Sequence, residues 1–151
     1  MPDLHIDEFY KDVARILVSL FGVFPRPVTL YVEDIAGPDE PDEYGVHSNR
    51  YQACFATLCW LQDEGYLRYA DTIRQEAVDQ TVLTGRAFSA LLAPAEESLF
   101  PQDDSLSRSE AGRRQSYLFQ LRHALEESDS AALARLVPTF MTGQMTPQLS
   151  R

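Results

Sequence analysis

The residue types that most often carry catalysis or bind metals are few and scattered in this sequence. The histidines His5, His47 and His123 stand far apart, and none has a second histidine or a cysteine at metal-ligand spacing. Cys54 and Cys59 lie five positions apart in a segment with helical periodicity. Their side chains should therefore diverge by roughly 140° and form no disulfide. We expect no metal site and no cofactor.

Motifs of nucleotide binding and of hydrolases are not found either. The segment Leu83–Arg86 lacks the glycine spacing and the lysine of a phosphate-binding loop, and there is no Gly-x-Ser-x-Gly elbow. The acidic pairs within residues 37–45 stand among glycines and prolines, which predicts a flexible, exposed loop rather than acid–base catalysis. A distant assembly of Cys59 with His47 stays open. We assign no catalytic residue and expect a protein that is not an enzyme.

Composition and charge indicate an acidic globular domain. The 151 residues are 44% hydrophobic and 24% charged, which suits a chain that buries a core. The formal net charge of −10 belongs entirely to residues 1–97, which hold 17 acidic and 7 basic residues. Such a surface repels phosphate backbones and anionic membranes and favours basic or apolar partners. The longest apolar run, residues 16–24, is too short for a membrane span, and reduced thiols suit the cytoplasm.

Hydrophobic periodicity predicts the elements that must position any site. Asp3 is expected to cap a first helix with one buried stripe. That stripe consists of Ile6, Phe9, Tyr10, Val13, Ile16, Leu17, Leu20 and Phe21. A β-branched strand at Val28–Val32 and a brief helix at Glu33–Ala36 follow, and then the acidic loop.

The middle of the chain changes from helical to alternating periodicity. A helix from about Asn49 to Glu64, capped by Ser48 and ended by Gly65, buries Tyr51, Cys54, Phe55, Leu58 and Leu61. Residues 66–69 and 78–83 predict a β-hairpin joined by a moderately long polar connection, residues 71–76. Thr84 then caps a helix, Gly85–Leu92, with Phe88, Leu91 and Leu92 facing inward.

Two further helices are predicted after a linker at residues 95–109. The first covers about 110–126 with the stripe Tyr117, Leu118, Leu121 and Leu125. The second starts from a Ser128 cap, carries Leu133, Leu136, Val137 and Phe140, and is truncated or bent by Pro138. Residues 142–151 are expected to be frayed.

Two runs carry a pattern known from a protein family. Leu58–Leu67 has the sequence Leu-Cys-Trp-Leu-Gln-Asp-Glu-Gly-Tyr-Leu, and Val82–Phe88 has Val-Leu-Thr-Gly-Arg-Ala-Phe. With the order of elements, these runs resemble the winged helix-turn-helix domain of bacterial regulators over about residues 5–93. The resemblance implies an α+β, mainly α fold, with a three-helix core and a β-hairpin wing in residues 1–94. The helices at 110–141 would then form a C-terminal appendage that packs back or mediates dimerisation.

Winged helices serve DNA binding and protein docking alike, so the function depends on the surface. DNA-contacting candidates are His47, Arg50, Arg68 and Arg74. Four acidic residues, Asp39, Glu40, Asp42 and Glu43, occupy the loop that the resemblance places near the DNA backbone. A transcription regulator would have to gather its arginines from a dimer, whereas the acidic loop could mimic nucleic acid for a basic partner.

The exposed face of the 49–64 helix favours a protein partner. It carries Asn49, Gln52, Ala53, Ala56 and Trp60, a small apolar strip beside two polar residues. Trp60 either packs under the C-terminal helices or stays open for a partner. We therefore predict a protein-interaction or regulatory-adaptor module that uses this face or the acidic loop.

A basic cluster marks the first C-terminal helix. It consists of Arg108, Arg113, Arg114, Arg122 and His123. The arginine stems could simply cover the apolar stripe while their charged ends stay in water. Alternatively, this helix pairs with the acidic domain of a second copy and forms a homodimer.

Overall fold

The computed structural model describes residues 3–96, 99 and 105–145. In chain order the described elements are α1 (Leu4–Val23), β1 (Val28–Tyr31), α2 (Val32–Ala36), α3 (Asn49–Asp63), β2 (Leu67–Arg68), β3 (Asp71–Ile73), β4 (Ala77–Leu83), α4 (Gly85–Leu92), α5 (Arg108–Arg114), α6 (Tyr117–Glu126) and α7 (Ser130–Met145). The chain is therefore α+β and mainly helical with a small antiparallel sheet, which confirms this coarse prediction. Much of the predicted linker and the last six residues of the predicted frayed tail lie outside the described residues.

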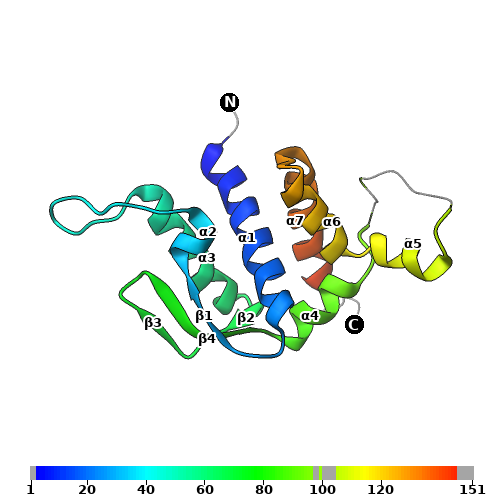
Figure 1. The fold of residues 1–151 in the computed structure, drawn as a ribbon, viewed down its shortest axis with the longest axis horizontal. Helices are drawn as coiled ribbons and strands as arrows, with labels where there is room; N and C mark the ends of the chain where they lie inside the picture. The colour runs from blue at the N-terminus through cyan, green and yellow to red at the C-terminus, as the bar shows by residue number, and fades with distance from the viewer. Residues whose placement is uncertain (1–2, 97–98, 100–104, 146–151) are drawn as a thin grey trace.

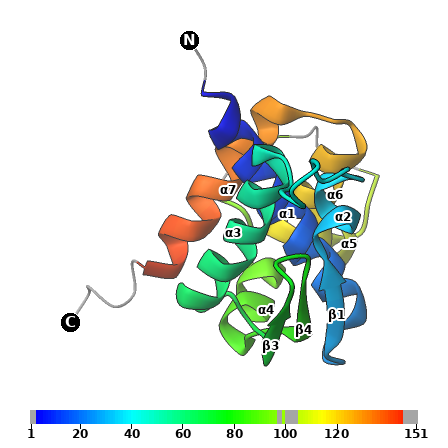
Figure 2. The same cartoon turned by 90° about the vertical axis from the view of Figure 1, so that its left-hand side faces the viewer.

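Helix α1 is the central element of the core. Its apolar stripe is fully buried at Val13, Ile16 and Leu17, because α3 packs on one side of it and α6 and α7 pack on the other. Figure 1 shows this arrangement, and Figure 2 shows the same helices from the side. Phe140 of α7 belongs to the same hydrophobic cluster as the α1 stripe. The C-terminal helices thus pack back onto the first helix and share one core with it.

The sheet is built around β4. β1 pairs along one edge of β4, from Val28 opposite Thr81 to Tyr31 opposite Ala77. β2 and β3 follow one another along the other edge, and every pairing is antiparallel. β4 therefore has a neighbour on both edges, which explains why Ala77, Val78 and Thr81 are buried.

The connection in the hairpin is shorter than predicted. Residues 71–73, the first half of the predicted connection, form the strand β3, and only Arg74 and Gln75 make the turn. Both have positive φ, 51° and 59°, and the Glu76 amide donates to the Ile73 carbonyl at 2.8 Å. This is the geometry of a tight hairpin turn. All three β3 side chains are exposed. The polar residues Asp71 and Thr72 were therefore interpreted as part of a loop, although they belong to an edge strand.

Three local signals in the middle of the chain act as predicted. The hydroxyl of Ser48 accepts a hydrogen bond from the Tyr51 amide and begins α3. Gly65, with φ of 83°, turns the chain from α3 into β2. The hydroxyl of Thr84 accepts from the Ala87 amide and begins α4. At the first helix, by contrast, Asp3 occupies the cap position without a side-chain hydrogen bond.

The C-terminal helices differ from the prediction in their ends. The expected 110–126 helix is two helices, because Ser116 caps α6 through the Phe119 amide and its backbone forms an antiparallel bridge with Pro94. The second cap is Asp129, whose carboxylate accepts from the Ala132 amide at 3.0 Å, while Ser128 has a positive φ of 52°.

Two expectations about single side chains are also corrected. Pro138 does not truncate α7, which continues past it to Met145, and of the two expected effects only the bend stays a prediction. Leu92 was expected to face inward but is 50% exposed, because it is the last residue of α4 and lies off the face on which Ala87, Ala90 and Leu91 are buried.

Candidate protein-interaction surface

The predicted partner face of α3 is exposed along its whole length. Asn49, Gln52, Ala53, Ala56 and Trp60 all reach solvent, and Trp60 is 38% exposed. The amide of Gln52 donates to the His47 carbonyl at 2.7 Å, so this polar side chain serves its own helix start. The C-terminal helices leave this face uncovered. What remains open is the apolar strip from Ala53 to Trp60.

This strip forms one wall of a groove whose other wall is the start of α1. The rings of Phe9 and Trp60 meet edge to face with their centroids 5.3 Å apart, and Ile6 above them is 38% exposed. The groove has a volume of about 260 Å³ and is lined by His5, Ile6, Glu8, Phe9, Asp12, Ala53, Ala56, Thr57 and Trp60. Its surface is almost entirely apolar, and the described residues that line it include no lysine or arginine.

The α1 wall of the groove is the part that sequence reasoning missed. Ile6 and Phe9 follow the same three- and four-residue spacing as the buried stripe, so they were predicted to lie in the core. The first part of the α1 stripe lies beside α3 in an open groove instead of a closed core, and Ile6 stays 38% exposed there. Spacing alone does not distinguish such a groove wall from a core position, so the sequence held no clear signal for it.

Arg50, the first arginine of α3, is held in an internal ion pair. Its guanidinium donates to both carboxylate oxygens of Asp12 at 2.7 and 2.5 Å, and Nε lies 3.1 Å from Glu8. Asp12 is only 1% exposed. The hydrogen bonds that Arg50 donates to Asp12 raise the pKa of Arg50, so its charge is fixed and already matched.

His47 is held in the same way at the start of α3. Its Nδ1 lies 2.9 Å from Asp39 and its Nε2 lies 3.0 Å from Glu76, while its ring stacks on Tyr51 at 3.8 Å. The hydrogen bond to Asp39 is the main cause that raises the pKa of His47. With a carboxylate at each nitrogen, the imidazolium donates to both. His47 thereby joins the acidic loop, α3 and the hairpin.

The acidic loop is shaped by hydrogen bonds rather than free. Asp39 accepts from the Ser48 amide at 3.1 Å, and bonds from Ser48 and then His47 lower the pKa of its carboxyl. Asp42 accepts from the amides of Tyr44 and Val46 and so closes the tip of the loop. The sequence did not predict these hydrogen bonds of Asp39 and Asp42, whereas the expected exposure of the loop agrees with the structure at Glu40, Asp42 and Glu43. The carboxylates of Glu40 and Glu43 remain exposed.

The remaining DNA-contacting candidates lie on the hairpin. Arg68 on β2 and Arg74 in the turn are both exposed. Arg74 lines a cleft of about 550 Å³ between the hairpin turn and α3, together with His47 and Tyr51. Two of the four predicted cations are therefore matched by carboxylates, and two are open to solvent.

Reactive groups are not assembled into a catalytic arrangement among the described residues. Burial raises the pKa of the Cys54 thiol to about 12, which keeps it protonated. Cys59 lies beside Tyr69, whose pKa is raised by burial to about 12, whereas both nitrogens of His47 are taken by carboxylates. Cys59 and His47 are thus engaged separately. No cluster of three or more metal-ligating side chains occurs within the described residues.

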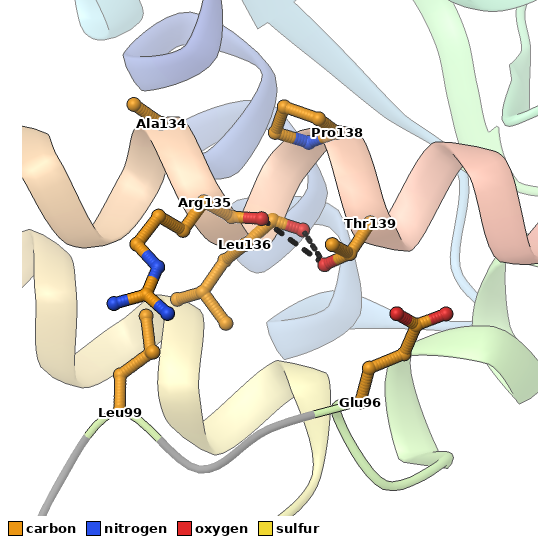
Figure 3. A pocket seen from close by; sticks show the side chains of 7 residues that line it. All are labelled: Glu96, Leu99, Ala134, Arg135, Leu136, Pro138 and Thr139. Carbon is orange, nitrogen blue, oxygen red and sulfur yellow. Dashed lines mark hydrogen bonds between the residues drawn. The ribbon is translucent and has the colours of Figure 1, made fainter.

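A further pocket of about 500 Å³ lies between α7 and the chain that follows α4 (Figure 3). Arg135 and Leu99 approach each other at one end, and Glu96 lies nearer Thr139. The Thr139 hydroxyl lies 3.1 and 3.0 Å from the carbonyls of Arg135 and Leu136. The Thr139 hydroxyl is therefore engaged by the backbone of its own helix.

Comparison with known proteins gives no match to any family model, curated protein or solved structure. Among the described residues, no helix combines the length and the apolar character that a membrane crossing requires.

Proposed function

We propose that this chain is a non-catalytic protein-interaction module, a regulatory adaptor built on an acidic winged helix. The order α1, β1, α2, α3 and hairpin, with β1 added to the far edge of β4, supports the winged-helix assignment. The two cysteines are free thiols, which favours a reducing, cytoplasmic setting.

One observation carries the proposal: the groove between α1 and α3 is apolar and open in the folded chain. Ile6 and Trp60 are large apolar residues left more than a third exposed, next to the exposed Ala53 and Ala56. Contiguous exposed apolar surface rimmed by polar residues marks interaction sites. A groove between two helices accepts the apolar side of a partner helix.

Charge selects the kind of partner. Residues 1–97, which contain both walls of the groove, hold the entire net charge of −10. A partner helix with leucines on one side and lysines or arginines on the other would bury the leucines against Trp60 and Ala56. Its basic residues would face the acidic surface and raise the association rate. We therefore propose a basic amphipathic helix as the occupant.

The groove can be tested with a designed helical peptide of about 18 residues, or five turns, with a leucine side and a lysine side. Isothermal titration should show binding to the wild type and at least a tenfold weaker affinity for Ala56→Arg, which places a bulky cation in the groove. Ala131→Arg, at an exposed alanine of α7, is the matched control and should bind like the wild type.

Two results would contradict the groove assignment. One is equal affinity of the peptide for the wild type and Ala56→Arg. The other is equal binding of a control peptide in which the same leucines and lysines are mixed around the helix, because that result would show charge attraction without apolar docking.

A DNA-binding regulator that acts as a dimer is the second candidate. Arg68 and Arg74 favour it because they are exposed on the hairpin, and Asn49 and Gln52 could face base edges. Arg50 and His47 weigh against it, since each is matched by two carboxylates. A gel shift with random duplex at low salt should show a complex that salt dissolves steeply if this candidate holds. No shift at micromolar protein would exclude it.

A further inference from the structure

A second open surface lies at the other end of the molecule, on α5 and α6. It is a pocket of about 530 Å³ whose lining includes Phe21, Leu92, Arg113, Phe119 and Arg122. Its surface is mostly apolar, and the described residues that line it include two arginines and no carboxylate. This pocket is separate from the groove between α1 and α3 and shares no residue with it.

Within the part of the chain that the structure describes, neither Arg113 nor Arg122 forms an ion pair with a carboxylate. Arg122 instead lies over the ring of Phe21 at 5.7 Å, and the neighbouring Arg114 lies over Phe119 at 5.5 Å. Cations held over aromatic rings keep their charge and their donors available. The pocket suits a ligand that combines carboxylates with an aromatic or apolar group.

The chain itself carries a segment with this chemistry. Tyr44, at the tip of the acidic loop, is 82% exposed, and Val46 is 52% exposed. Glu40 and Glu43 stand beside them without a partner in the described structure. Figure 1 shows the loop and α5 at opposite ends of the long axis, so a copy cannot fill its own pocket.

We propose that the loop 40–46 of one copy docks in the α5–α6 pocket of a second copy. Tyr44 enters the apolar pocket beside Phe119, and Glu40 and Glu43 pair with Arg113 and Arg122. The bonds that Asp42 accepts from Tyr44 and Val46 preform the loop tip, so little conformational freedom is lost on docking. The contact joins two different surfaces, and copies therefore associate as closed rings or antiparallel pairs, or as open chains.

Sedimentation velocity over a range of protein concentrations tests this association. The wild type should gain mass as the concentration rises and lose it in high salt. The double variants Glu40→Lys/Glu43→Lys and Arg113→Glu/Arg122→Glu should each associate at least tenfold more weakly. Lys11→Glu/Arg68→Glu reverses two exposed cations outside both surfaces and should associate like the wild type.

An equimolar mixture of the two defective variants gives the sharpest result. Each carries one intact surface, so the mixture should form complexes at a concentration where either variant alone is monomeric. Association of Ala56→Arg should equal that of the wild type, which separates this contact from the groove proposed above.

Three results would overturn the proposal. The first is a wild type that stays monomeric at all concentrations, and the second is a mixture that stays monomeric. The third is a monomeric wild type whose pocket binds a synthetic acidic peptide with a central tyrosine, because the natural occupant would then belong to another protein.

Discussion

The start of α3 and the surface of α5–α6 use positive charge in opposite ways. At α3, Arg50 is bound by a carboxylate that is 1% exposed, and His47 is held between two acids. At α5–α6, Arg113 and Arg122 meet no carboxylate among the described residues, and Arg122 rests on an aromatic ring. Both regions are rich in cations in the sequence, yet only one keeps them available.

The number of cations in a region therefore does not show whether it binds a ligand. What matters is whether those cations already have carboxylate partners within the fold. Removing the buried partner of a cation is costly to the fold, and a cation held in such a pair has few donors left for a ligand. A cation over an aromatic ring can still pair with an incoming carboxylate. The same substitution should therefore mainly reduce stability in the first region and mainly reduce association in the second.

The largest effect is expected at Asp12. Asp12→Asn leaves the guanidinium of Arg50 with only the half-exposed Glu8 and should lower the free energy of unfolding by about 2–4 kcal/mol, measured by urea denaturation. Asp34→Asn, at an exposed position of α2, is the control and should change it by less than about 0.5 kcal/mol. Equal stability of Asp12→Asn and the control would contradict the claim that the Arg50–Asp12 pair has a structural role.

The next effect concerns the pH dependence that His47 contributes. Its pKa in the folded chain is raised above the ordinary value of 6.5, chiefly by Asp39, so its stabilisation is complete below 6.5 and is lost as the pH rises through the raised value. The pKa of Asp39 is lowered from 3.8, so its stabilisation is present above 3.8 and is lost as the pH falls through the lowered value. The pair of His47 and Asp39 therefore contributes most to the stability of the fold between pH 3.8 and pH 6.5.

His47→Gln measures the part of this dependence that belongs to the histidine. The loss of unfolding free energy between about pH 6 and about pH 9 should be smaller in the variant than in the wild type. Urea denaturation at several pH values within this window gives both curves. Parallel curves for the two proteins would show that the Asp39 and Glu76 contacts add nothing to stability.

The smallest effect on stability is expected at the α5–α6 arginines. Arg113→Gln and Arg122→Gln should each change the free energy of unfolding by less than about 0.5–1 kcal/mol, because both side chains are exposed and an exposed cation–π contact contributes little. Arg50→Gln, the same substitution at α3, should cost clearly more in the same denaturation experiment. A large decrease in the free energy of unfolding for Arg122→Gln would show that this arginine stabilises the fold instead of staying available for binding.

Local signals explain what the sequence predicted well. Ser48 and Thr84 cap their helices through amides three residues ahead, and Gly65 needs only its own positive φ. Such features depend on neighbours in the chain and are visible in the residue order. The exposed face of α3 was predicted in a similar way, from the helical spacing of the apolar residues between positions 49 and 64.

Contacts between distant segments could not be predicted from one sequence. Arg50 and Asp12 stand 38 positions apart, and His47 and Glu76 stand 29 apart, so nothing in their spacing indicated a pair. The hairpin turn was missed for a different reason. Arg74 and Gln75 take positive φ without the asparagine or glycine that usually marks such a turn.

Trp60 offers an intrinsic fluorescence probe of the groove. It is the only tryptophan in the sequence, and its indole stands in the groove with part of its surface in water. A helix that entered the groove would replace that water with apolar side chains, and the fluorescence emission of the indole would shift to the blue. The α5–α6 pocket contains no tryptophan. The intrinsic emission of the unlabelled protein therefore reports filling of the groove separately from association of copies.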